Sequence, residues 1–143
     1  VSVMNLIRLS HLIDDPIWTD RIARTFRLFA ARLEQAGRAV PMMAAAFSAF
    51  AAGLQHVVVV GEGPAAEALL DAAGDVYRPF SMVLRLTPDA QRDLAELVPF
   101  LAGMHLVEGQ PAAYICRDFA CRAPVLTPEA LVHELSASTR SDS

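Results

Sequence analysis

The chain has 143 residues, of which 54% are hydrophobic and 20% are charged, and this composition predicts a compact fold and excludes a disordered tail. The formal net charge is -4, with 16 acidic and 12 basic residues, so a nucleic-acid partner, which would need a basic surface, is not expected. All 12 basic residues are arginines, and the absence of lysine excludes a P-loop lysine, a Schiff-base lysine and a pyridoxal phosphate anchor.

Residues 1–53 predict a segment of helices. Apolar residues recur at helical spacing from Ser2 to Leu12, and Asp14-Asp15-Pro16 then supplies a turn with a proline at a helix start. A second helix, with Gly37 where its C-terminal cap would lie, has the clearest periodicity. Its apolar residues are three or four positions apart: Trp18, Ile22, Phe26, Phe29 and Leu33. The third helix, Met42 to Ala52, is rich in Ala, Met and Phe on nearly every side, so it needs neighbours on most sides.

Residues 54–143 predict a small α/β domain. His56 to Val60 is a short β-branched run, which is typical of a strand buried on both faces. Pro64 to Ala73 has helical composition, Gly74 closes it, and Ser81 to Leu86 predicts a second strand. The succession of strand, helix and strand indicates a parallel pair.

The remaining elements have clear start signals. Thr87-Pro88-Asp89 places a capping hydroxyl, a proline and an acid at the start of a helix that we expect to reach about Val98. Pro111 to Arg117 predicts a third strand, and Thr127-Pro128-Glu129 begins a last helix, after which the tail from Ser136 to Ser143 should fray. The predicted fold class is α/β, with an N-terminal helical segment followed by a three-stranded, mainly parallel sheet with flanking helices.

A glycine-rich turn follows the first predicted strand. Gly61-Glu62-Gly63-Pro64-Ala65-Ala66 fits the G-x-G-x-x-A spacing of a dinucleotide-binding turn, so Gly61 and Gly63 are candidate phosphate-binding residues. Glu62 opposes this interpretation because it places a negative charge where a pyrophosphate would lie, and Pro64 removes an amide that would bind it. A structural turn is favoured, with weak nucleotide or sugar-phosphate binding as the alternative.

Two cysteines, Cys116 and Cys121, end the third predicted strand. They are too few for the disulfide framework of a small secreted scaffold, which favours a reducing, cytoplasmic location. The flanking Arg117 and Arg122 favour thiolate chemistry, so a redox pair is one hypothesis. The C-x4-C spacing nevertheless differs from the C-x-x-C of thioredoxin-like catalysts. Structural or loosely reactive thiols are therefore favoured.

Metal binding and catalysis have weaker support. Zinc at the cysteines would need two more ligands, which only the scattered His105 and His133 offer. His133-Glu134 lacks the second histidine of an H-E-x-x-H motif, and His11 and His56 are isolated in the sequence. No G-x-S-x-G elbow is present. We expect no catalytic residue, no metal and no cofactor, and therefore no enzyme in this chain by itself.

The longest apolar run and the first residue of the chain indicate whether a membrane span, a signal peptide or a longer protein is expected. The longest apolar run, Val40 to Leu54, is about fifteen residues, too short for a ~30 Å hydrocarbon core, so no membrane partner is expected. The chain begins with Val1 and has no signal-peptide pattern. We expect it to be cut from something longer.

Four stretches occur in an order that matches a known family: Ser2 to Leu9, Val57 to Gly61, Leu97 to Met104, and Ala113 to Cys121 with Pro124. With them, the chain from Ser2 to about Leu135 resembles the C-terminal part of the thioredoxin-domain-containing family that includes spermatogenesis-associated protein 20 and its bacterial relatives. The last two stretches are the most specific. The Cys116 and Cys121 pair matches a family motif, and the match does not define its role.

The resemblance implies a longer protein. It would have a thioredoxin-like domain, then an (α/α) toroid similar to six-hairpin glycosidases and sugar epimerases, with residues 1–53 as the last toroid helices. No catalytic residue transfers to this chain, because the thioredoxin-like motif and most of the toroid cavity would lie upstream. The implied function is a non-catalytic structural module that packs on the toroid and supports or lids its cavity, with a thiol redox module as the alternative. The expected partners are the upstream domains and, for this piece alone, a second copy of itself.

Overall fold

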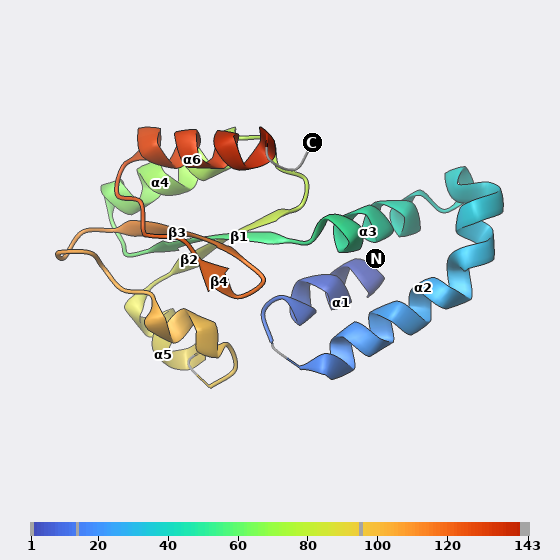
Figure 1. Ribbon diagram of the computed structural model, residues 1–143. Coiled ribbons are helices and arrows are strands. Elements are labelled where there is room, and N and C mark those ends of the chain that lie inside the picture. The colour runs from blue at the N-terminus through green and yellow to red at the C-terminus, as the bar shows by residue number, and fades with distance from the viewer. Residues whose placement is uncertain (1, 14, 95, 141–143) are drawn as a thin grey trace. The chain divides into compact units, whose positions relative to one another are not determined.

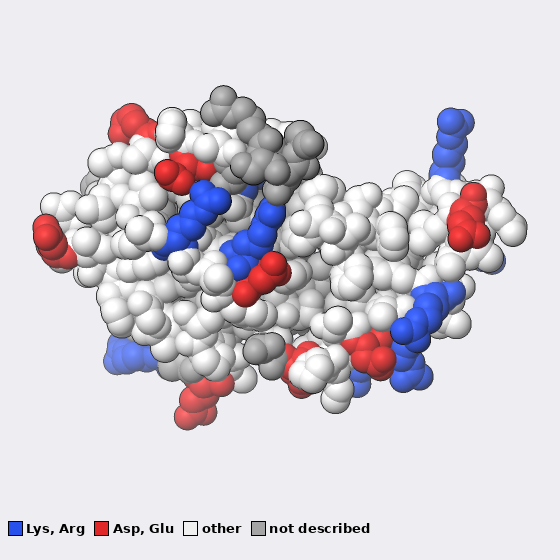
Figure 2. Space-filling view, viewed as in Figure 1, with Lys and Arg blue, Asp and Glu red and all other residues white. Residues whose placement is uncertain are grey.

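The computed structural model describes residues 2–13, 15–94 and 96–140. By their internal contacts these residues form two compact units, Val1–Leu54 and Gln55–Ser143 (Figure 1). Among the described residues, no helix is long and apolar enough to span a membrane. On the face shown in Figure 2, described arginines and acidic side chains are interspersed rather than gathered into one basic surface.

The first unit is helical. It contains α1 (Ser2–Ser10), α2 (Pro16–Ala36), a short 3-10 turn η1 (Gly37–Ala39) and α3 (Pro41–Ala52), which confirms the predicted helices. Asp15 caps α2, because its side chain accepts a hydrogen bond from the Ile17 amide at 2.9 Å. Asp14, the other acid of the predicted turn, lies outside the described residues.

An aromatic cluster joins α2 and α3. The ring of Phe26 lies 5.3 Å from that of Phe47 and 5.5 Å from that of Phe50, measured between centroids. Edge-on and tilted rings at this separation attract beyond their burial alone. Several other apolar side chains of the unit stay exposed: Leu9, Ile17, Leu28 and Met42, together with part of Phe47 and Phe50.

The second unit is α/β. Its elements are β1 (Gln55–Val60), α4 (Pro64–Asp75), β2 (Ser81–Leu86), α5 (Pro88–Leu94), a 3-10 turn η2 (Pro99–Gly103), β3 (Ala112–Arg117), β4 (Ala120–Cys121) and α6 (Pro128–Arg140). The fold class α/β is confirmed. Figure 1 shows α4 and α6 on one face of the sheet and α5 on the other.

The sheet differs from the predicted one. It has four strands within the described chain, in the order β2-β1-β3-β4. The predicted parallel pairing of β1 with β2 is confirmed, but β3 runs antiparallel to β1, and β4 runs antiparallel to β3. The prediction of a three-stranded, mainly parallel sheet was therefore wrong.

The connection between β2 and β3 explains the antiparallel direction. Leu86 and Ala112 are both paired with Val60, so β2 ends and β3 begins at the same end of the sheet. The α-helix described between them, α5, has 7 residues and spans about 10 Å, about half the length of a six-residue strand. The connection passes over β1 and returns to the end of the sheet where it started, so β3 runs antiparallel to β1.

The helix boundaries follow their local signals. Thr87 Oγ1 accepts the Ala90 amide at 3.2 Å, as the capping motif predicts. The helix ends at Leu94 rather than near Val98. Pro99 disfavours helical backbone at Val98, which has φ -133° and ψ 71°.

The last helix has the same start signal and extends further than expected. Thr127 Oγ1 accepts the Ala130 amide at 3.3 Å. The helix continues to Arg140, so the expected fraying from Ser136 was wrong for these residues, since no glycine or proline follows Leu135. Residues 141–143 lie outside the described residues.

The central strand β1 is buried on both faces, as predicted. Val57 and Val59 pack against α4 and α6 through Leu69, Leu131 and Leu135. Val58 and Val60 alternate with them and lie in a second apolar layer. The other buried residues of this layer are Leu86, Val98, Leu101, Met104 and Cys116. Successive strand residues point to opposite faces, so one run of valines supports both layers.

A polar side chain holds the second layer together. Gln91 of α5 donates from Nε2 to the carbonyl oxygens of Leu101 (2.9 Å) and Met104 (2.8 Å). Both acceptor residues are almost fully buried. The Leu101 carbonyl also accepts the Met104 backbone amide at 3.1 Å, whereas the hydrogen bond to the Met104 carbonyl comes from Gln91.

We expect Gln91→Ala to lower the free energy of unfolding by about 1–3 kcal/mol, because it removes the donor from the buried Met104 carbonyl and one of two donors from the Leu101 carbonyl. Urea denaturation followed by circular dichroism measures the change. Gln110→Ala, at an exposed glutamine, is the matched control and should change stability by less than about 0.5 kcal/mol. Equal effects of the two substitutions would contradict this account.

Candidate functional site

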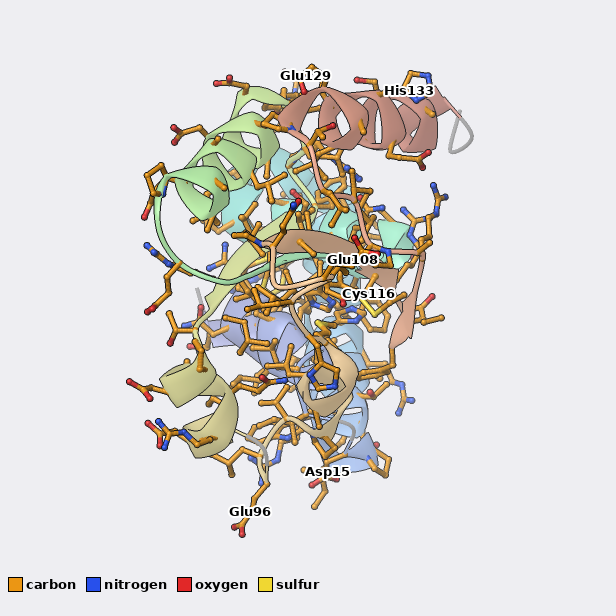
Figure 3. The ribbon with its side chains drawn as sticks, turned by 90° about the vertical axis from the view of Figure 1, so that its left-hand side faces the viewer. Asp15, Glu96, Glu108, Cys116, Glu129 and His133 are labelled. Atoms are coloured by element: carbon orange, nitrogen blue, oxygen red, sulfur yellow. A yellow bond between two sulfur atoms is a disulfide. The ribbon has the colours of Figure 1, made fainter. Side chains whose placement is uncertain are left out.

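Cys116 and Cys121 are joined by a disulfide that closes the β3–β4 hairpin (Figure 3). The two residues face each other as register partners, and Arg117 and Ala120 form the next pair toward the turn. The Cα atoms of the cysteines are 4.0 Å apart, within the limit of about 7 Å beyond which a disulfide cannot close. The geometric condition for a redox pair is therefore met.

The turn between the cysteines depends on tertiary contacts. Asp118 (φ 49°) and Phe119 (φ 62°) both have left-handed backbone, as a two-residue hairpin turn of the primed type requires. Such turns favour Asn or Asp followed by Gly, and a phenylalanine there is unfavourable. The Phe119 ring contacts that of Phe100 of η2 at 5.6 Å, and Phe100 lies 5.9 Å from the ring of His56. The contact with η2 offsets the unfavourable backbone.

The two cysteines differ in exposure. Cys116 is fully buried in the apolar layer that contains Leu101 and Met104. Cys121, on the two-residue edge strand β4, is exposed. A thiol in solution can therefore approach Cys121 more readily than Cys116.

The flanking arginines do not act together on the cysteines. Arg122 forms an ion pair with Glu134 of α6, at 3.2 Å, so its charge is already compensated by a carboxylate. Arg117 is exposed at the end of β3. The structure thus weakens the expectation that Arg122 favours a thiolate.

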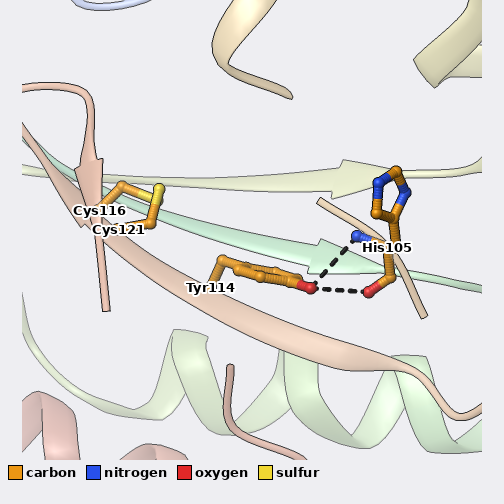
Figure 4. Close-up of a disulfide and its surroundings, with 4 residues drawn as sticks. All are labelled: His105, Tyr114, Cys116 and Cys121. Atoms are coloured by element: carbon orange, nitrogen blue, oxygen red, sulfur yellow. Dashed lines mark hydrogen bonds between the residues drawn. A yellow bond between two sulfur atoms is a disulfide. The ribbon is translucent and has the colours of Figure 1, made fainter. Parts of the chain in front are cut away.

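The candidate zinc ligands are not brought together. His133 lies on α6, which packs on the opposite face of the sheet from Cys116 (Figure 3). Tyr114 lies between His105 and the two cysteines (Figure 4). The Tyr114 hydroxyl accepts a hydrogen bond from the His105 backbone amide at 3.2 Å and donates one to the His105 carbonyl at 2.8 Å. In the described part of the chain, no group of three or more His, Cys, Asp or Glu could hold a metal ion.

The glycine turn after β1 has a steric requirement of its own. Gly61 has φ 119°, and a Cβ there would lie 3.0 Å from Leu106 Cδ2 and 3.1 Å from Pro111 Cβ. Gly63 has φ 83°, with open space around it. In the first turn of the following helix, Glu67 pairs with Arg85 of β2 at 2.6 Å. Packing therefore accounts for Gly61, and phosphate binding at Gly61 and Gly63 stays a prediction.

A shallow groove of about 600 Å³ follows β4, and the sequence carries no signal for it. It lies between α6 and the segment that leads into that helix. The lining residues are Arg122, Ala123, Pro124, Val125, Leu126, Thr127, Ala130, His133 and Glu134. The polar groups include the Arg122–Glu134 ion pair, and the rest is mainly apolar.

We expect Gly61→Ala to destabilise the protein by more than about 1 kcal/mol, since the added methyl meets two side chains and the backbone is left-handed. Gly74→Ala is the control, because Gly74 lies in α4 with no atom within 4 Å of its Cβ position, and it should stabilise by roughly 0.5 kcal/mol. Thermal unfolding of both variants measures the changes. A neutral Gly61→Ala would remove the packing explanation and strengthen that of a ligand-binding turn.

Comparison with known proteins finds longer relatives. Spermatogenesis-associated protein 20 of Homo sapiens is 30% identical over 130 residues, which are 90% of this chain and 16% of that protein. The protein of the same name from Rattus norvegicus is 30% identical over 130 residues, and an uncharacterized protein of Caenorhabditis elegans is 29% identical over 127 residues. No family model and no solved structure matches the chain.

These matches cover nearly all of this chain and a small share of each relative. The chain spans 16% of the length of the human and rat proteins and 17% of that of the nematode protein. The chain belongs to the spermatogenesis-associated protein 20-like family and corresponds to a small part of the length of these relatives.

Proposed function

We propose that the chain is a non-catalytic structural module of a larger protein. Its helical unit would supply the last helices of an (α/α) toroid, and its α/β unit would pack on that toroid and support or lid its cavity. The toroid comes from the family resemblance, and the small share of each relative that the chain covers supports a module within a longer chain.

The exposed apolar side chains of the helical unit carry this proposal. Leu28 on α2 is 83% exposed, and Met42 and Phe47 on α3 are 54% and 50% exposed. The α3 sequence PMMAAAFSAFAA has no charged residue that would make any side of this helix favourable in water. Apolar surface of this kind marks an interface, and toroid helices would bury it against the neighbouring hairpins.

The arrangement of the candidate residues supports a module without catalysis. The cysteines are bonded to each other, His133 lies across the sheet, and His105 lies beyond Tyr114. A nucleophile, a base and an orienting group must lie within hydrogen-bond reach of one another, and these side chains do not converge in that way.

The native gene product should be several times larger than the 15.4 kDa of this chain. An antibody raised against the α/β unit, used on extracts of the source cells, measures the mass of the product that contains it. A single band near 15.4 kDa would contradict the module proposal and make the hairpin cysteines the first residues to test for an activity.

The chain by itself should associate with further copies, because water-exposed apolar helix faces attract one another. Light scattering after size-exclusion chromatography measures the mass. We expect Leu28→Glu together with Met42→Glu to shift the mass toward that of a monomer, with unchanged helical circular dichroism. The matched control is Thr19→Glu, at an exposed position of α2, which should leave association unchanged. A monomeric unmodified chain with little dye binding to apolar surface would contradict the proposal.

A further inference from the structure

We infer that the Cys116–Cys121 disulfide is a thiol–disulfide exchange site at which a dithiol attacks the exposed Cys121. The substrate class is a dithiol, either a small molecule or a pair of protein thiols. The inference rests on the hairpin in the α/β unit and does not depend on the proposed role of the helical unit.

The position of the disulfide in the chain argues against a stabilising role. Cys116 and Cys121 are 5 positions apart in the sequence. A crosslink stabilises a fold mainly by restricting the unfolded chain, and this effect grows with the length of the closed loop. A bond across so short a hairpin stabilises less than one across a long loop, about 2 kcal/mol against about 3 kcal/mol for a 15-residue loop, so stability is a weaker reason for it.

The difference in exposure defines the direction of attack. Cys116 is fully buried among Leu101, Met104 and their neighbours, so an incoming thiolate cannot reach its sulfur without opening the apolar layer. Cys121 is exposed on the edge strand. Exchange depends on access to one of the two sulfurs, and this arrangement selects Cys121 as the attacked residue and Cys116 as the leaving thiol.

Backbone pairing on both sides would keep the two thiols together after reduction. β3 is paired with β1 along all six residues, which holds Cys116 in place. Beyond Cys121, the Arg122 amide donates to the Ile115 carbonyl at 3.0 Å, and Ala113 and Val125 exchange two hydrogen bonds at 2.8 and 2.9 Å. The reduced pair therefore stays within reach of reoxidation without refolding.

The exchange balances in two steps. A thiolate of the dithiol attacks Cys121 Sγ, the Sγ–Sγ bond breaks, and Cys116 leaves as a thiolate that takes up a proton. The second thiolate of the donor then attacks the donor sulfur in the mixed disulfide and releases Cys121, which also takes up a proton. The donor loses two electrons and two protons and becomes a disulfide, and the hairpin gains them as two thiols.

The direction of attack is tested with two single-cysteine variants. Cys116→Ala leaves Cys121, and Cys121→Ala leaves Cys116, and circular dichroism verifies that both fold. With 5,5′-dithiobis(2-nitrobenzoic acid) as the probe, we expect Cys121 to react at least about tenfold faster than Cys116 in buffer. In about 8 M urea the chain is unfolded and both thiols are exposed, so the two rates should converge. Equal rates in buffer, or a faster Cys116, would overturn the assignment of Cys121.

Reversibility is tested on the unmodified chain. Reduced dithiothreitol should convert the hairpin to two alkylatable thiols, detected by intact mass, while the circular dichroism spectrum is unchanged. Oxidised dithiothreitol should then restore the bond. Reduction that occurs only together with loss of the folded spectrum, or only in denaturant, would show a purely structural disulfide and overturn the inference.

Discussion

The α/β unit is arranged around a strand that has no exposed face. The four consecutive valines of β1 alternate between two apolar layers, and each buried valine side chain contributes about 1.5–3 kcal/mol relative to an exposed one. Such a strand requires cover on both sides. The helices α4 and α6 supply it on one face, and α5 with η2 supplies it on the other. The need to cover β1 also determines the surroundings of the hairpin cysteines, because Cys116 is buried in the layer of α5 and η2.

The connection after β2 determines where that hairpin lies. It brings the chain back to the end of the sheet where β2 finishes, so β3 starts there and runs antiparallel to β1. The strand then ends in a two-residue turn at the sheet edge, and the turn is held through Phe119 by Phe100 of η2. The layer that covers β1 thus also supports the unusual turn, which couples the geometry of the disulfide to the packing of η2.

The helical unit and the hairpin lead to different kinds of function. Exposed apolar side chains on α2 and α3 are typical of helices that belong to a larger assembly, and the chain covers 16% of its human relative. The hairpin instead presents a localised chemical feature, with one accessible and one buried cysteine. A structural module can carry such a reversible bond, since the bond joins the edge strand β4 to a cysteine in the layer of α5 and η2 and lies outside the apolar layer of α4 and α6.

Much of the local structure was predictable from the sequence, because it depends on neighbouring residues. The valine run of β1, the threonine caps of α5 and α6, and the helices of the first unit were found from spacing and capping signals alone. The strand β4 was missed because two residues carry no periodicity and Asp118-Phe119 lacks the glycine that marks a hairpin turn. Contacts distant in sequence decided the rest. These contacts decided the direction of β3, the pairing of the cysteines, the separation of His133 from them and the steric requirement at Gly61. The sequence by itself therefore determined the helices and most strands, and the tertiary structure decided which of them lie side by side, because those contacts form only on folding.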